Sequence, residues 1–557
     1  MLNLPNPTAS FRQWLPPALL AVVSICIFWP SMGHEFLINW DDLQYVTDNP
    51  VIQGFTPQHI KDAFSKIFVG NYAPLHIISY MLDFHIWGLR SSGFIMTNIL
   101  LHTANGLLFY QLLNRMAAGY LWPFFAALLF LLHPVQVESV VWISQRKNVL
   151  AMFFFLASFL AYLRYRDSGR MHRGIFYLLS LFAFCLSMLS KSAAVILPAA
   201  LLLHDHCFIK KQDLKQLLLD KIPYIVISAV FAAVAIQSHS AQTLGGGTSY
   251  HGGTPFSTFL TMLPIIISYL RMIVWPSGLS AFYDPPIKTE IDLHVAGAAI
   301  LCIVMVAAGT YLYRHRRGSF FWFALFFIGL LPVLQIVPIV TLMNDRYLYF
   351  PMLGAAPLLA FSVLDNLSWS DLSTGIRSKA LTVACILALA LLAVATSRRI
   401  PVWHDSYSLW KDTVTRAPNV PLVHDGFGES LLQRGQLEEA IGQFMVSLQL
   451  QPDSSTPGLS VGKRNALANT LNNLGTAYGM KGMTDLAIRH FTEVVRLDPG
   501  FDKAHFNLGN ALANSGKFEK ALSSFEEAFR LNPSNSTYRK NLELTRELIG
   551  KGVSTEP

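Results

Sequence analysis

The stretch HEFLINWDDLQYVTDN, residues 34–49, directly follows the first membrane-length apolar run of the chain. It places two adjacent carboxylates, Asp41 and Asp42, just beyond the hydrocarbon and behind Trp40, whose ring favours the headgroup level. A charged residue near a hydrocarbon boundary is costly, so it is rarely kept there without a use. A solvated acidic loop is the simpler interpretation of such a pair. Other features of the chain favour a functional role for the two carboxylates.

Composition indicates a membrane protein. The chain has 557 residues, of which 52% are hydrophobic and 14% are charged. Soluble globular proteins carry roughly 25% charged residues, so most of this chain is expected to lie in lipid. The net charge of +8 could indicate nucleic-acid binding, but the basic residues gather in short clusters between apolar runs. Such clusters are typical of topology signals, and no nucleic-acid partner is expected.

No metal or redox motif is present in the sequence. Four of the five cysteines lie inside apolar runs, and no pair has the spacing of a zinc site or a disulfide framework. Three histidines, His76, His85 and His102, lie on half-apolar helices, where the nearby backbone usually satisfies the ring. We therefore predict no metal ligands and no certain cofactor, while a divalent ion at the site stays open.

Apolar runs, several of them shorter than the roughly 20 residues that cross a bilayer, recur along the first 398 residues. Their approximate positions are 15–32, 94–113, 119–133, 147–164, 174–190, 192–204, 223–239, 257–275, 293–313, 319–338, 350–364 and 378–396. The first run lacks a small-residue cleavage site, so it is expected to remain as a span. The run at 257–275 holds Pro264 and Arg271, which favours an interfacial or re-entrant segment. The sequence predicts an all-α polytopic membrane domain, residues 1–398, with about eleven spans.

Basic residues orient these spans. Three clusters alternate with apolar runs, and the positive-inside rule places all three in the cytoplasm. They are Arg164, Arg166, Arg170 and Arg173; Lys210, Lys211, Lys215 and Lys221; and Arg314, Arg316 and Arg317. We expect a cytoplasmic N-terminus, and an odd number of spans then places the C-terminus outside. Compact loops and the lack of an organelle-type retention tail favour a bacterial inner membrane, with a periplasm on the outer side.

Four outer loops collect the unusual polar residues. They cover residues 33–93, 133–140, 243–253 and 343–350 and hold carboxylates, His and Arg. We expect them to form a polar cavity at the lipid boundary, although separate solvated connectors are the simpler alternative. The GGG at 245–247 is not a phosphate-binding loop, because no Lys-Ser or Lys-Thr follows it and no strand precedes it.

The chain turns polar near residue 399 and gains a 34-residue period. Gly475 and Phe491 recur 34 residues later as Gly509 and Phe525. Small residues at the helix crossing and a Pro after the second helix resemble the tetratricopeptide repeat. The expected α-solenoid covers residues 399–550, with repeats at about 421–454, 468–501 and 502–535, an insertion at 455–467, a capping helix at 536–549 and a tail at 551–557. Such arrays form a concave groove for peptides, and nothing in this one indicates catalysis.

An acidic pair after the first span, together with helical repeats after the last, resembles the family of transmembrane protein O-mannosyltransferases with tetratricopeptide repeats. More broadly, the chain resembles the GT-C glycosyltransferases, which use lipid-phosphate sugars. The matching blocks are HEFLINWDDLQYVTDNP (34–50), NYAPLHIISYMLD (71–83), HPVQVESVVWISQRKNVLA (133–151) and NDRYLYFPMLG (344–354). The chain departs from the family pattern at Val137-Glu138 and at Gln145-Arg146. These departures concern the identity of the sugar and the acceptor more than the fold.

The resemblance implies an inverting hexosyltransferase that moves a sugar such as mannose from a polyprenyl-phosphate donor to an outer acceptor, for example Ser or Thr hydroxyls of a protein. The donor keeps its tail in lipid, so the reacting carbon lies just outside the hydrocarbon. The acceptor hydroxyl must lose a proton as it attacks, and a carboxylate within hydrogen-bond reach can take it. The leaving phosphate needs a cation or hydrogen-bond donor to hold its charge.

Eight residues are candidates for this chemistry. Asp41 is the expected base, because it matches the first acid of the family pair. Asp42 would orient Asp41 or bind the acceptor, and Glu138 would act on the acceptor or metal side. The candidates for binding the substrate and its phosphate are His133, Arg146, Lys147, Lys191 and Arg346. Arg suits this role because its planar fork matches phosphate oxygens.

Some candidates have simpler interpretations. Arg146 and Lys147 could snorkel to the headgroups, and Arg346 could pair locally with Asp345. Lys191 lies between two apolar runs, where a charge is costly to keep, and this favours a function.

Two other functions remain open from the sequence. An O-antigen ligase or polymerase would place its working residues on a large late outer loop, whereas this chain carries its acidic pair in the first loop. A non-catalytic scaffold that recruits protein partners would not need Lys191 or the acidic pair. The expected partners are the lipid-linked sugar donor, a protein or peptide acceptor bound by the repeats, and the bilayer itself.

Overall fold

The computed structural model describes residues 7–551 except 118–119, 210–217, 243–249, 365–375, 454–455 and 457–458. Most of the Gly-rich loop, the lysines at 210, 211 and 215, and the tail after residue 551 lie outside the described residues. The described residues form helices joined by loops, with an isolated β-bridge between Phe68 and Asn71. The all-α class is therefore confirmed. The chain divides into two compact units, Met1–Asp405 and Ser406–Pro557.

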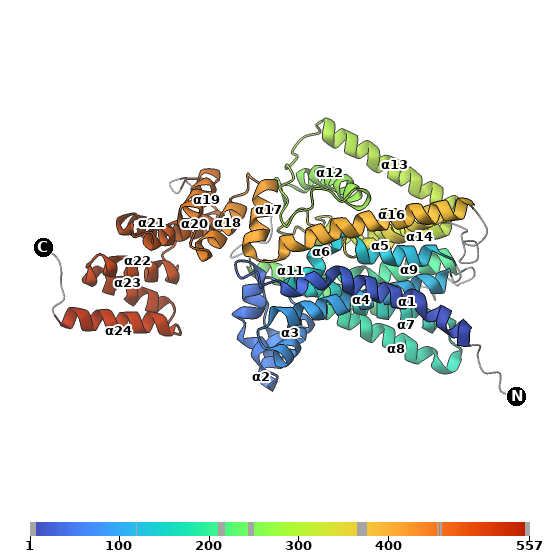
Figure 1. The fold of residues 1–557 in the computed structure, drawn as a ribbon, viewed down its shortest axis with the longest axis horizontal. Helices are drawn as coiled ribbons and strands as arrows, with labels where there is room; N and C mark the ends of the chain where they lie inside the picture. Colours follow the sequence, from blue (N-terminus) through green and yellow to red (C-terminus); the bar gives the residue numbers. More distant parts are fainter. Residues whose placement is uncertain are drawn as a thin grey trace. The chain divides into compact units, whose positions relative to one another are not determined.

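The first unit is a helical bundle (Figure 1). Its longer helices are α1 (Pro7–Phe28), α2 (Pro57–Ser65), α3 (Pro74–Trp87), α4 (Ser91–Met116), α5 (Trp122–Leu132), α6 (Val137–Val141), α7 (Arg146–Asp167), α8 (Arg170–Ser190), α9 (Leu197–Phe208), α11 (Ile222–Gln242), α12 (Pro255–Val274), α13 (Leu293–His315), α14 (Arg317–Leu330), α15 (Met352–Leu364) and α16 (Ile376–Arg399). Short helical turns between them are η1 (Trp29–Gly33), η2 (Leu43–Thr47), η3 (Pro50–Gln53), η4 (Pro134–Gln136), η5 (Ile143–Gln145), η6 (Ser192–Ile196), η7 (Leu331–Val333), η8 (Asp345–Leu348) and η10 (Ile400–Trp403).

The helices of this unit identify a multi-pass membrane protein. In the described part of the chain, six segments are long and apolar enough to cross a bilayer: Trp14–Gly33, Ile143–Asp167, Met171–Ser190, Pro255–Val274, Leu293–His315 and Ser378–Trp403. A bent pair, Trp122–Leu132 with Pro134–Val141, makes a seventh if the 50° break lies within one span. The expected count of about eleven also needs α4 and shorter apolar helices of 10–17 residues, and it stays a prediction.

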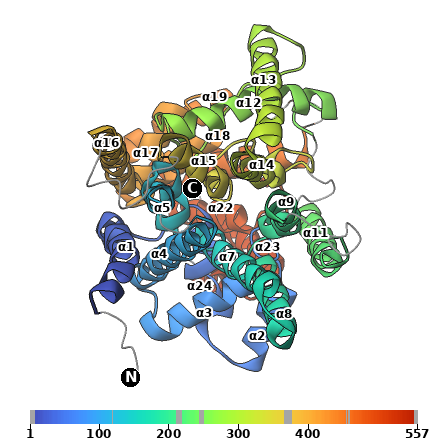
Figure 2. The ribbon, with the colours of Figure 1, turned by 90° about the vertical axis from the view of Figure 1, so that its right-hand side faces the viewer.

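The segment expected to be interfacial or re-entrant, 257–275, folds as one continuous helix, α12. The side chain of Thr254 caps its first turn by accepting a hydrogen bond from the Ser257 N–H at 3.1 Å. Length and hydropathy would allow α12 to span a bilayer. However, α12 is seen lengthwise in Figure 2, where α1 and α16 are seen nearly end-on. The unbroken helix argues against a re-entrant turn, and the choice between an interfacial helix and a full span stays a prediction.

Helix α7 carries polar clusters at both ends. Its 22 residues give a length of about 33 Å, close to the roughly 30 Å thickness of the hydrocarbon core. Arg146 and Lys147 begin the helix. Near its other end, Arg166 lies 3.1 Å from Asp220, a residue of the basic loop that was expected to be cytoplasmic. The polar ends and the apolar middle of α7 match the two faces of a bilayer.

Two glycines bring α14 and α15 close together. A Cβ on Gly354 would lie 2.3 Å from the backbone nitrogen of Phe326 and 2.5 Å from the backbone oxygen of Trp322. A Cβ on Gly329 would lie 2.7 Å from the Cα of Pro351. This close approach positions η8, which directly precedes α15 and contacts α6 and η4.

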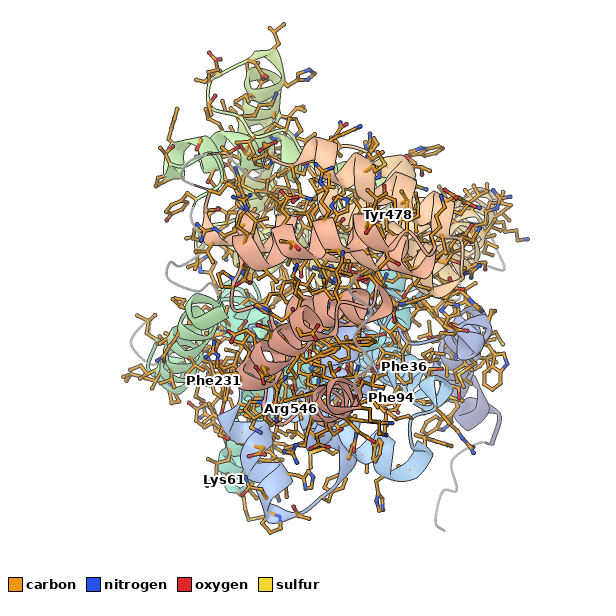
Figure 3. The ribbon with its side chains drawn as sticks, turned by 90° about the vertical axis from the view of Figure 1, so that its left-hand side faces the viewer. Phe36, Lys61, Phe94, Phe231, Tyr478 and Arg546 are labelled. Atoms are coloured by element: carbon orange, nitrogen blue, oxygen red, sulfur yellow. The ribbon has the colours of Figure 1, made fainter. Side chains whose placement is uncertain are left out.

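The second unit is built from paired helices. They are α17 (Ser406–Arg416), α18 (Pro421–Gln433), α19 (Leu437–Leu450), α20 (Val461–Met480), α21 (Thr484–Leu497), α22 (Asp502–Asn514), α23 (Phe518–Leu531) and α24 (Ser536–Gly550). The pairs α18/α19, α20/α21 and α22/α23 fall on the three expected repeats, and α24 falls on the expected capping helix. Figure 3 shows the side chains of this unit, with Tyr478 of α20 and Arg546 of α24 labelled.

Two boundaries differ from those expected from the sequence. Helix α20 begins at Val461, inside the expected insertion 455–467, because Ser460 caps it and Leu467 is buried in the repeat core. The first unit extends past residue 398 to Asp405. Its last turn, η10, belongs to the membrane unit because Trp403 stacks on Trp142, with 5.5 Å between the ring centroids.

We expect Gly354→Ala to lower the free energy of unfolding by roughly 1–3 kcal/mol, because overpacked atoms force the backbone apart. The atoms that the new methyl group would meet belong to the α14 backbone, which cannot rotate away. Thermal unfolding of the purified protein in detergent measures the effect. Gly297→Ala on α13 is the matched control, since a Cβ there meets nothing within 4 Å. Equal unfolding temperatures for the two variants would contradict the close α14–α15 packing.

Candidate active site

Asp42 ties the first outer loop to the turn before α7. One of its carboxylate oxygens, Oδ2, accepts a hydrogen bond from the Leu37 N–H at 2.9 Å. The other, Oδ1, accepts from the Ser144 N–H at 3.0 Å and from the Ser144 hydroxyl. Burial raises the pKa of Asp42 to about 6, although these donors favour the charged form. With both oxygens engaged, Asp42 serves as an anchor for the loop.

Asp41 has a different environment from its neighbour. Its side chain is half-buried, and none of the described residues forms a hydrogen bond or ion pair with it. It interacts electrostatically with Lys147 and Arg346. A partly exposed carboxylate near cations, without a fixed partner, is available to accept a proton from a bound hydroxyl.

Glu138 and Arg346 form a buried ion pair between two outer segments that are 208 residues apart in the chain. Glu138 Oε1 pairs with the guanidinium, and Oε2 accepts from the Arg346 backbone N–H at 2.7 Å. The guanidinium carbon also lies 5.5 Å from the ring centroids of Trp142 and Tyr347. The alternative in which Arg346 pairs with its neighbour Asp345 is therefore wrong.

Asp345 has other partners. The Tyr283 hydroxyl donates to Asp345 Oδ1, and Arg399 Nη2 lies 3.9 Å from Oδ2. Burial raises the pKa of Asp345 above its ordinary value. The sequence analysis missed Arg399, because a basic residue at the end of the last apolar run looks like a topology signal.

Three tryptophans pack beside these charges. The Trp40 and Trp142 ring centroids are 4.6 Å apart, and Trp142 stacks on Trp403. The guanidinium of Arg346 lies over Trp142, and that of Arg399 lies 5.9 Å from the Trp403 centroid. Cation–π contacts of this kind hold a guanidinium in place within an apolar setting. Trp40 therefore belongs to an internal cluster that joins the first loop to η10.

Lys147 and Lys191 lie near each other and line one small pocket with Asn71. Lys147 Nζ donates to the Tyr45 hydroxyl at 3.3 Å, and Lys191 Nζ donates to Asn148 Oδ1. Within the described ranges, neither lysine has a carboxylate at ion-pair distance. Lys191 also interacts electrostatically with Glu138 and Arg346. Lys147 is buried and Lys191 is half-buried. Two such cations, without a carboxylate at ion-pair distance among the described residues, are suited to an anionic ligand such as a phosphate.

The guanidinium of Arg146 is fully engaged by contacts with other protein groups. It lies 2.5 Å from an oxygen of Asp83 and donates to Asn98 Oδ1 at 2.8 Å and to the Phe94 carbonyl at 2.7 Å. Its guanidinium carbon lies 4.6 Å from the Tyr80 ring centroid, and the side chain is fully buried. These contacts support neither the expected phosphate contact nor snorkelling to the headgroups.

His133 supports the break between α5 and η4. Its Nδ1 accepts from the Val135 N–H at 3.3 Å, and its Nε2 faces the Ile273 carbonyl at 2.9 Å. Both ring nitrogens are thus used by the backbone, and His133 positions the turn that carries Glu138. Among the described residues, no group of three or more His, Cys, Asp or Glu is placed to hold a metal ion.

The eight residues selected from the sequence therefore separate into two groups. Asp41, Glu138, Lys147, Lys191 and Arg346 interact with one another and form the candidate site. Asp42, Arg146 and His133 are engaged by protein partners that support it. The sequence analysis missed Ser144, Asn148 and Tyr45 as supporting partners, although the first two lie within the family-like block 133–151.

Comparisons with known proteins identify the repeat and a group of relatives. Residues 502–535 match the family model of the tetratricopeptide repeat. The chain is 25% identical to protein O-mannosyl-transferase TMTC1 of Homo sapiens, over 82% of this chain and 56% of the relative. It is 22% identical to TMTC3 of Mus musculus, over 80% of this chain and 52% of the relative. It is also 24% identical to protein O-mannosyl-transferase F38B6.6 of Caenorhabditis elegans, over 78% and 62%.

Among solved structures, the first tetratricopeptide domain of Spaghetti (RPAP3), bound to an HSP90 peptide, is 20% identical with a TM-score of 0.21. It covers 23% of this chain, and 93% of that chain is matched.

The fold and the site define a multi-pass membrane protein with C-terminal tetratricopeptide repeats and a charged site at one end of its bundle. The chain is a homologue of the TMTC-family protein O-mannosyl-transferases, as the sequence resemblance predicted. It spans slightly more than half the length of the relatives it matches.

We expect Asp42→Asn to lower the free energy of unfolding by roughly 1–3 kcal/mol, because the amide turns one acceptor into a donor that faces N–H groups. Asp41→Asn should unfold at nearly the wild-type temperature, since no hydrogen bond to Asp41 is lost. Thermal unfolding of both variants in the same detergent makes the comparison. The assignment of Asp42 as the anchor of the loop would be contradicted if Asp41→Asn were the less stable variant.

Proposed function

We propose that this protein transfers a hexose, mannose being the first candidate, from a polyprenyl-phosphate donor to hydroxyl groups of protein acceptors. The observation that carries the proposal is the placement of Asp41, without a fixed partner, near Lys147 and Arg346. The relatives described above are protein O-mannosyl-transferases, which supports both the sugar and the acceptor.

The proposed reaction exchanges two bonds at the anomeric carbon. The acceptor oxygen forms a bond to C1 of the sugar while the bond from C1 to the phosphate oxygen breaks. The bonding pair leaves with the polyprenyl phosphate, and the hydroxyl proton moves to Asp41. Attack opposite the leaving group inverts the configuration at C1.

The cations stabilise the negative charge of the leaving phosphate in the proposed reaction. Lys147 and Lys191 line one pocket and have no carboxylate partner among the described residues, so a phosphate can supply their counter-charge. Arg346 is fixed by Glu138 and Trp142 and contributes positive charge beside them. In this assignment Glu138 positions Arg346 and does not act as a base.

We further propose the topology that the basic clusters predict. The N-terminus is cytoplasmic, about eleven spans follow, and the outer loops and the repeats share the outer side of a bacterial inner membrane. This arrangement gives the repeats access to exported acceptor proteins. A purely scaffolding function would give no use to Lys147 and Lys191, which have no carboxylate at ion-pair distance in the described ranges.

Asp41→Asn should lower turnover by about 10²–10⁴-fold, the usual contribution of a general base. Asn keeps the shape of the side chain and loses the proton acceptor, so the affinity for the donor should change little. The measurement is transfer of labelled mannose from polyprenyl-phosphate mannose to a Ser/Thr-rich peptide, with the protein in nanodiscs. Asp48→Asn, an exposed residue in the same loop, is the matched control. Full turnover of Asp41→Asn would move the base assignment to another carboxylate.

Lys191→Met should weaken donor binding by about 10–100-fold, because a hydrogen bond to a charged group contributes about 1.5–3 kcal/mol. The KM for the polyprenyl-phosphate donor should rise more than kcat falls, since the lysine contacts the phosphate in both ground and transition states. Lys66→Met, an exposed residue, is the control and should leave KM unchanged. An unchanged KM for Lys191→Met would place the phosphate elsewhere.

A further inference from the structure

The pocket lined by Lys147 and Lys191 is nearly closed. Its volume is about 10 Å³, roughly the room that one water molecule occupies. A phosphate group is larger than a water molecule, so it cannot enter unless part of the wall moves. The proposed contact between these lysines and the donor phosphate therefore requires the pocket to open.

Helices form one side of this pocket, and a loop forms the other. The helical side consists of Lys147 of α7, residues 190–192 at the junction of α8 and η6, and Ala235 of α11. The opposite side consists of residues 70–73, in the loop that joins α2 to α3 (Figure 1). Residues 66 and 67, at the start of this loop, are exposed, so little packing there resists a displacement. The loop is therefore the wall that moves most readily.

The loop contains a tight turn with an unfavourable backbone. Phe68 and Asn71 form a β-bridge, in which the Asn71 N–H donates to the Phe68 carbonyl at 2.9 Å. Between them, Val69 has a φ of 47° and Gly70 a φ of 66°. A type I′ turn requires such left-handed values at both central positions. Gly adopts them readily, whereas a β-branched residue is strained there. An extended backbone at Val69 would relieve this strain, so Val69 destabilises the closed turn.

Tyr45 holds the turn in its closed position. Its hydroxyl donates to the Phe68 carbonyl at 3.2 Å and accepts from Asn71 Nδ2 and Lys147 Nζ, both at 3.3 Å. Asn71 Nδ2 also donates to the Val69 carbonyl at 2.6 Å. One hydroxyl thus links a lysine of the pocket to the turn that covers it. A phosphate that draws Lys147 Nζ toward itself weakens this link, which couples ligand binding to opening.

We propose that the turn Phe68–Asn71 is a lid over the phosphate pocket, closed by Tyr45 and destabilised by the strained backbone of Val69. When the lid opens, Val69 becomes extended, and Lys147 and Lys191 become accessible to the phosphate of the donor. The apparent affinity then falls in proportion to the fraction of molecules whose lid is open. That the ligand is a donor phosphate rests on the proposed function, whereas the opening of the turn does not.

The variant Val69→Asn tests the lid. Asn tolerates the left-handed region better than Val, and Asn-Gly is a favoured pair for a type I′ turn. The substitution therefore stabilises the closed lid without replacing either lysine. Ile67→Asn is the matched control, because residue 67 is exposed and lies in the same loop without a left-handed backbone.

The first measurement needs no ligand. Hydrogen exchange of the full chain in phosphatidylcholine nanodiscs, followed by mass spectrometry, reports how often the Asn71 N–H leaves the Phe68 carbonyl. Val69→Asn should slow exchange in the segment 68–72 by about 5- to 30-fold, the effect of relieving the strain of one residue. Ile67→Asn should exchange like the wild type. Equal exchange in Val69→Asn and the wild type would overturn the assignment of Val69 as the residue that destabilises the lid.

The second measurement is the Kd of polyprenyl phosphate, without a sugar, in the same nanodiscs. Val69→Asn should raise this Kd by about 5- to 30-fold, because a smaller fraction of its lids is open. Polyprenyl phosphate should also speed exchange of residues 68–72 in the wild-type protein, since the closed pocket has no room for it. This last readout needs no variant, so it tests the lid even if Val69→Asn fails to fold.

The outcomes separate the lid from the proposed function. An unchanged Kd for Val69→Asn, or bound polyprenyl phosphate that leaves the exchange of residues 68–72 unchanged, would overturn the lid. An unchanged Kd for Lys191→Met, or no binding by the wild type, would instead count against the phosphate site of the proposed function. Hydrogen exchange without ligand would then still decide whether the turn opens.

Discussion

The ion pair between Glu138 and Arg346 is the contact on which the site depends. It joins the bend after α5 to η8, two segments that are 208 residues apart along the chain. A buried pair of this kind is costly to break, because removing one partner leaves an uncompensated charge. The close α14–α15 contact at Gly354 and the backbone contacts of His133 hold its two sides. The ion pair and these supporting contacts define the arrangement of Asp41, Lys147 and Lys191.

The acidic pair of the first loop illustrates how adjacent, identical side chains can take different roles. Asp42 is fixed through both oxygens by Leu37 and Ser144, whereas none of the described residues forms a hydrogen bond or ion pair with Asp41. An anchored residue can hold its neighbour at a chosen distance from the cations, which is how preorganisation supports a reaction. In the proposed reaction, Asp42 supplies the geometry and Asp41 accepts the proton.

The repeat unit is the part that the sequence predicted most completely. A 34-residue period is a local property, since each repeat folds against its neighbours, and the third expected repeat coincides with the family match at 502–535. The membrane unit was predicted less fully. Its class and its first long spans followed from hydropathy, but α12 and the shorter helices do not reveal by composition whether they cross a bilayer.

The sequence by itself determined the all-α membrane class, the repeats and the candidate residues. Hydropathy, period and residue type are properties of short stretches of sequence, so they can be read without knowledge of distant contacts. Only the tertiary structure separated Arg146, which is enclosed by Asp83 and Asn98, from Lys147, the next residue along α7. Successive residues of a helix point about 100° apart, so their neighbours come from different distant segments. The partner of Arg346 was likewise decided by packing over 208 residues, a distance at which sequence spacing carries no information about contact.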